Sequence, residues 1–90
     1  MAESLVAAWA RSVSPERRAA AARSPVANSR LVSQLASDAS PEVRVAIAAR
    51  KSLPEELLKA LRKDSDPAVS ASARENPNYQ PGFFDRLLGG

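Results

Sequence analysis

Apolar residues recur along the chain at the spacing of short amphipathic helices. Val43, Ala46 and Ile47 lie at i, i+3 and i+4, whereas Arg44 falls outside this stripe, as expected when one face of a helix is buried. A second stripe consists of the leucines within residues 57–61. Prolines separate successive stripes and interrupt the helical pattern; they are Pro25, Pro54, Pro77 and Pro81. The pattern predicts an all-α fold.

The pattern repeats every 26 residues, which is the spacing between Pro15, Pro41 and Pro67. Each of these prolines follows Ser or Asp, a combination that favours a helix start. The apolar pairs keep the same spacing; they are Leu5-Val6, Leu31-Val32, Leu57-Leu58 and Phe83-Phe84. Residues 26 apart thus occupy equivalent positions, here called a column of the repeat. Agreement between several separate columns indicates an internal two-helix repeat.

The repeat divides the chain into a half repeat and three repeats, which are residues 1–13, 14–39, 40–65 and 66–90. One pair of short helices cannot bury its apolar stripe, but stacked pairs cover one another. The sequence therefore predicts a single α-solenoid domain over residues 1–90. The repeat with a neighbour on both sides supplies the residues expected to be mostly buried: Val43, Ile47, Leu57 and Leu61.

The repeat unit resembles the leucine-rich repeat variant family, a bacterial relative of HEAT-type solenoids. The resemblance rests on Ser40-Pro41-Glu42-Val43-Arg44, Ala46-Ile47-Ala48, Pro54, Leu57-Leu58, Leu61, Asp64 and the Asn76-Pro77 dipeptide. It implies a right-handed superhelix of short helices that serves in binding. Some family members carry an iron–sulfur segment, but this chain has no Cys to hold a cluster, so the cofactor is not carried over.

Composition excludes several classes of chemistry. The chain has no Cys and no His, which removes thiolate nucleophiles, disulfides and the usual zinc ligand sets. It also has no Gly-rich phosphate loop or nucleophile elbow. We therefore expect a protein that is not an enzyme and binds no cofactor or metal. With no basic and apolar leader at the N-terminus, a cytoplasmic protein without a membrane partner is expected.

The net charge of +3 is concentrated in the first 37 residues, where five arginines face two glutamates. Arg17, Arg18, Arg23 and Arg30 form the candidate basic surface. Arg18 and Arg44 share one column of the repeat and could bind phosphate or carboxylate, or could clip repeats together by bonding Asp38 and Asp64. Arg17 stands where other repeats have Val43 and Val69, and we interpret it as a polar N-terminal cap.

The C-terminal end supplies three further candidates. Tyr79 lies in a turn-rich loop, where it could anchor a partner or pack over a helix end. Phe84 and Leu88 enlarge apolar positions of the last repeat and could form a docking surface, including one for a second copy of the chain. The alternative is that these side chains close the end of the solenoid.

The first hypothesis for function is an adaptor that presents the solenoid surface to a protein partner. The second is a nucleic-acid-binding module that uses the basic N-terminal third; the absence of interleaved aromatic residues disfavours stacking on single-stranded bases. A third is that the chain is a fragment of a longer solenoid.

Overall fold

The computed structural model describes residues 2–77. This part of the chain contains six α-helices and no strand: α1 (Glu3–Ala10), α2 (Pro15–Arg23), α3 (Ser29–Leu35), α4 (Pro41–Ala48), α5 (Glu55–Arg62) and α6 (Pro67–Arg74). The prediction of an all-helical chain is confirmed for these residues. One helix precedes Ser14, and two lie in each of the ranges 14–39 and 40–65, as expected.

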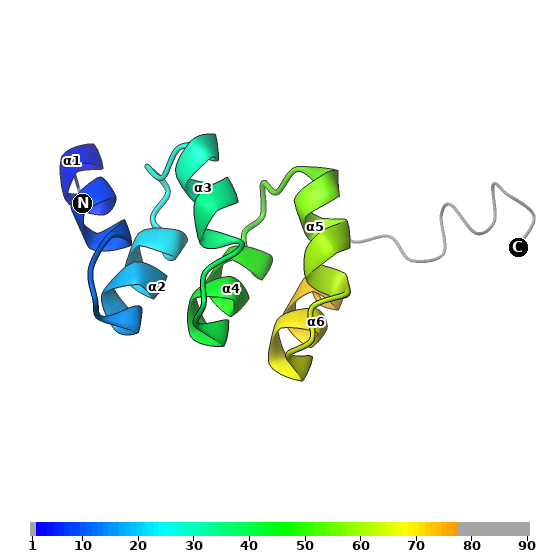
Figure 1. The fold of residues 1–90 in the computed structure, drawn as a ribbon. Helices are drawn as coiled ribbons and strands as arrows, with labels where there is room; N and C mark the ends of the chain where they lie inside the picture. The colour runs from blue at the N-terminus through cyan, green and yellow to red at the C-terminus, as the bar shows by residue number, and fades with distance from the viewer. Residues whose placement is uncertain (1, 78–90) are drawn as a thin grey trace, which may run out of the picture.

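The helices form two rows (Figure 1). Helices α1, α3 and α5 make one row, and α2, α4 and α6 make the other, so that the chain crosses between rows after every helix. The most extensive contacts join α4 to α2 and α4 to α6. The α2–α4–α6 row is therefore the closely packed one, and α4 lies in its middle.

Side-chain caps mark the starts of α2, α3 and α6. Ser14 Oγ accepts a hydrogen bond from the Arg17 N–H, and the Asp66 carboxylate accepts from Ala68 and Val69. Helices α2, α4 and α6 each have proline at the first position, where the missing N–H costs nothing. The Asn28 side chain caps α3 by accepting a hydrogen bond from the Leu31 N–H. The Ser-Pro and Asp-Pro signals thus correspond to helix starts.

One continuous apolar core runs between the two rows. Its largest fully buried side chains are Ile47, Val6, Val43 and Val69. Alanine fills the remaining positions at which helices approach closely; the alanines with no exposed surface are Ala19, Ala21, Ala22, Ala48 and Ala73. Small side chains let the helices of the α2–α4–α6 row pack tightly.

The four residues expected to be mostly buried all belong to the core or pack against it. Val43, Ile47 and Leu61 are buried. Leu57 is only half-buried, and its neighbour Leu58 occupies the buried position instead. Leu58 and Leu61 belong to the core, whereas Leu57 packs against it from the edge.

Candidate functional site

Arg18 is held by the fold and does not project freely. Its Nε and Nη2 donate to the two carboxylate oxygens of Asp38 at 2.9 and 3.2 Å, and its Nη1 donates to the Ser12 carbonyl at 2.8 Å. Only 18% of the Arg18 side chain and 11% of the Asp38 side chain are exposed. Of the two interpretations given above, the clip between repeats is the one that these contacts support.

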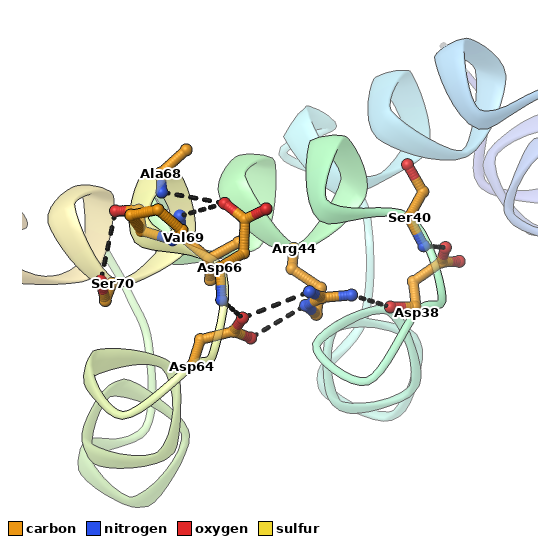
Figure 2. Close-up of polar contacts among 9 residues, drawn as sticks. Asp38, Ser40, Arg44, Asp64, Asp66, Ala68, Val69 and Ser70 are labelled. Atoms are coloured by element: carbon orange, nitrogen blue, oxygen red, sulfur yellow. Dashed lines mark hydrogen bonds and ion pairs between the residues drawn. The ribbon is translucent and has the colours of Figure 1, made fainter.

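Arg44 makes the same contacts one unit further along. Its Nε and Nη2 donate to Asp64 at 2.8 and 3.2 Å, and its Nη1 donates to the Asp38 carbonyl at 2.7 Å. Figure 2 shows the Arg44 guanidinium between Asp64 on one side and the Asp38 backbone on the other. In α6 the corresponding residue is Ser70, whose hydroxyl donates to the Pro67 carbonyl of its own helix.

The Asp64 carboxylate is stabilised in its charged form. Partial burial by itself would raise its pKa, but the hydrogen bonds from Arg44 and from the Asp66 N–H, together with the Arg44 charge, hold the pKa below its ordinary value. The Asp66 N–H donates at 2.9 Å. Asp64 therefore joins the Arg44 side chain to the turn that starts α6.

Arg17 lies at the N-terminal end of the α2–α4–α6 row. It is exposed, and its guanidinium carbon lies 5.8 Å from the ring centroid of the half-buried Trp9, within the range of a cation–π interaction. Its exposure agrees with the interpretation of Arg17 as a polar cap.

The four candidate arginines do not form one basic patch. Arg18 is engaged by Asp38, and Arg17 lies over Trp9. Arg23 is exposed in the last turn of α2, six residues from Arg17, which places the two on different sides of the helix. Arg30 is on α3, next to the groove described below. The structure thus distributes the basic residues of the N-terminal third over separate surfaces.

An open groove of about 570 Å³ lies between the N-terminal halves of α1 and α3. Sequence reasoning missed this site, because its walls come from two helices and a loop. Apolar and polar side chains both line it: Glu3, Ser4, Val6, Ala7, Val26, Asn28, Arg30, Leu31 and Gln34. Val26 is 43% exposed there, and with the half-buried Leu31 it gives the groove an apolar surface, which makes the groove a candidate for binding.

A second groove, of about 430 Å³, lies between α5 and the segment that follows α3. Leu57 and Leu61 form its apolar side, and the Arg44–Asp64 ion pair borders it. Its charged side chains are already paired, Arg44 with Asp64 and Asp38 with Arg18. This groove therefore offers a less apolar surface than the one between α1 and α3.

Sequence reasoning also missed two side chains that tie helix ends together. Arg50 Nη1 donates to the carbonyls of Ala22 and Ser24 at 2.6 and 2.9 Å. Asn76 Nδ2 donates to the carbonyls of Ala48 and Arg50 at 2.8 and 2.7 Å. The Asn76-Pro77 dipeptide was the available sequence signal for this contact at Asn76. The equivalent position one unit earlier is Arg50, a different residue type, so no such signal marks that position.

Three candidates lie outside the described residues, namely Tyr79, Phe84 and Leu88. The docking surface predicted at the C-terminal end therefore stays a prediction. Within residues 2–77, no group of three or more His, Cys, Asp or Glu side chains is arranged to hold a metal ion. In that same range, no helix combines the length and the apolar character that crossing a bilayer requires.

Comparison of the chain with known protein families, characterised proteins and solved structures gives no match.

Proposed function

We propose that this chain is a non-enzymatic binding module, a right-handed α-solenoid with a 26-residue two-helix period that presents its surface to a protein partner. Support for the period comes from contacts that recur 26 residues further along the chain. The ion pair between Arg18 and Asp38 recurs as the pair between Arg44 and Asp64. The hydrogen bond from Arg50 to the Ala22 carbonyl recurs as the bond from Asn76 to the Ala48 carbonyl. The resemblance to leucine-rich repeat variants favours the same arrangement, in a bacterial and cytoplasmic protein.

The groove between α1 and α3 is the proposed binding site. The observation that carries this proposal is the 43% exposure of Val26 beside the half-buried Leu31 in an open groove. Glu3 and Arg30 place opposite charges on its border. An amphipathic protein segment fits such a surface, because its apolar side chain can cover Val26 while its polar groups meet both charges.

A nucleic acid fits this surface less well. Phosphate binding needs several cations that face one backbone. Here the Arg18 charge is neutralised by Asp38, and Arg30 shares the groove with Glu3. The groove therefore favours a protein partner over the nucleic-acid alternative.

The experiment compares two substitutions in the tagged full chain. Val26→Glu places a charge in the groove, and Val13→Glu makes the same change at a position that is 97% exposed and does not line the groove. We expect Val26→Glu to reduce capture of the partner from nuclease-treated lysate at least tenfold, and Val13→Glu to leave it unchanged. Equal losses in both variants, or capture abolished by nuclease, would contradict the proposal.

A second interface is proposed at Phe84 and Leu88, through self-association or docking of another segment. Replacing both residues with Ser separates docking from capping. A docking surface loses association while the thermal midpoint is retained, whereas a closing cap loses the fold.

A further inference from the structure

The α2–α4–α6 row has two end faces, and each can be identified by comparing exposure at equivalent positions. Arg17 is exposed in α2, whereas the equivalent Val43 and Val69 are 0% exposed in α4 and α6. This column is thus covered in a helix that has a predecessor in the row. Helix α2 is the first of the row (Figure 1), so Arg17 marks its N-terminal end face.

The opposite face follows from a second column. Ala22 in α2 and Ala48 in α4 are 0% exposed, but the equivalent residue of α6, Arg74, is exposed. This column is covered in a helix that is followed by another in the row. Helix α6 has no such successor in residues 2–77, so Arg74 marks the C-terminal end face of the row as the structure describes it.

Each end face thus carries an arginine at a position where the interior interfaces carry Ala or Val. Between α4 and α6, the two columns contribute Ala48 and Val69. If a second copy continued the row, its α2 would lie on α6 of the first copy. The same two columns would then contribute Arg74 and Arg17, two like charges that lose their hydration.

The tethering contacts are also missing from such a junction. Inside the row, Arg50 reaches the carbonyls at the end of α2, and Asn76 reaches those at the end of α4. The equivalent residue at the start of the row is Ser24, whose short side chain accepts the Val26 N–H within its own loop. A copy stacked on α6 would therefore have no equally long donor at this position.

We propose that Arg17 and Arg74 block the two end faces of the α2–α4–α6 row against a second copy of this chain. Without these two charges, the α6 face of one copy could pack on the α2 face of another as α4 packs on α6 within the chain. Such a contact joins different surfaces of two copies and leaves an open face at each end, so copies would add one after another into a filament, or into a ring if the rotation between copies closes. The inference depends on the packing of the row and not on the partner proposed above.

The test restores the interior residue types at both ends. The double variant Arg17→Val/Arg74→Ala should form assemblies that grow with concentration in sedimentation velocity, beyond any self-association that the parent shows through Phe84 and Leu88. Each single variant leaves one arginine at every junction and should behave like the parent. An equimolar mixture of the two single variants should form one-to-one dimers, because each copy then offers one open face and keeps one blocked face.

Matched controls separate these faces from a general effect of lost charge. Arg11→Val/Arg23→Ala makes the same changes in columns that are exposed in every unit of the described chain, and it should stay like the parent. Arg17→Lys/Arg74→Lys keeps both charges and should do so as well.

The proposal is overturned if the double variant, shown to be folded by circular dichroism, sediments like the parent. If the double variant precipitates, the mixture of single variants decides. Dimers in the mixture but not in its components support blocked end faces, and their absence refutes them.

Discussion

At the scale of single residues, the arginines of this chain divide into structural and exposed ones. Arg18, Arg44 and Arg50 donate to carboxylates or carbonyls on other elements. Arg17 and Arg23 are exposed. Since a guanidinium has five N–H groups in a fixed plane, a single side chain can join two separate parts of the backbone. The structural arginines use this property to link consecutive units.

The Arg44–Asp64 pair should contribute measurably to stability. Both side chains are largely buried and the contact uses two nitrogen atoms, so we expect a double-mutant cycle with Arg44→Ala and Asp64→Ala to give a coupling energy of about 1–2 kcal/mol. Urea unfolding of the four proteins measures it. The Arg18–Asp38 cycle should give a similar value because its geometry is the same. Coupling near zero in both cycles would contradict the assignment of these pairs as clips.

The contribution of Asp64 should depend on pH. Its pKa in the folded chain is lowered from the ordinary value of 3.8, so the unfolded chain binds the proton more tightly. The stabilisation is complete above the ordinary pKa and is lost as the pH falls through the lower, folded one. We therefore expect the difference in unfolding free energy between the parent and Asp64→Asn to shrink as the pH is lowered from about 6 to about 2. A difference that stays constant over this range would disprove the effect.

Arg50 should be replaceable by asparagine. Asn76 makes the equivalent pair of carbonyl contacts with its amide alone, and the buried Arg50 Nε has no hydrogen-bond partner among the described atoms. Arg50→Ala leaves the Ala22 and Ser24 carbonyls without this donor and should cost about 1–3 kcal/mol. Arg50→Asn should cost less than half of that in chemical unfolding. If both variants lose equal stability, the two positions are not interchangeable.

At the scale of helices, starts are determined by neighbouring residues, whereas ends depend on the next unit. Asp66 caps α6 through its own side chain. The last carbonyls of α2 and α4, by contrast, receive donors from residues 26 to 28 positions later. Helices α2 and α4 are thus each completed at the C-terminal end by the loop that follows the next helix of their row.

Helix capping gives a prediction with an internal control. Asp66 accepts hydrogen bonds from two N–H groups, whereas Ser40, at the same position of α4, makes no side-chain capping bond. Asp66→Ala should therefore lower the unfolding free energy by about 1 kcal/mol, and Ser40→Ala by less than about 0.5 kcal/mol. Thermal melts of the two variants test this difference. The reverse order would show that capping does not determine the stability of these helices.

At the scale of the whole molecule, stability depends on α4, which contacts both other helices of its row. Ile47 is fully buried, whereas Leu57 lines a groove and is half-buried. Ile47→Ala should cost about 2–5 kcal/mol, a large part of the stability of a domain this small. Leu57→Ala should cost clearly less, because the groove already gives solvent access. Equal losses in urea unfolding would contradict this account of the core.

The sequence by itself determined the features that depend on neighbouring residues. Ser-Pro and Asp-Pro pairs place helix starts, because the cap and the fixed proline φ act within one turn. Spacing of three and four residues predicts which side of α4 is buried, and Val43 and Ile47 are buried as expected. Even the pairing of Arg18 with Asp38 was open to prediction, since both residues recur in fixed register with Arg44 and Asp64.

Only the tertiary structure decided the features that depend on distances between elements. The packing of α5 leaves Leu57 partly exposed at a groove and gives the buried position to Leu58, although both leucines fit the same stripe. The reach of Arg50 to Ala22 and the position of Arg17 over Trp9 depend in the same way on how two elements pack. Periodicity specifies which face of a helix is apolar, but the distance to the next helix determines how much of that face meets solvent.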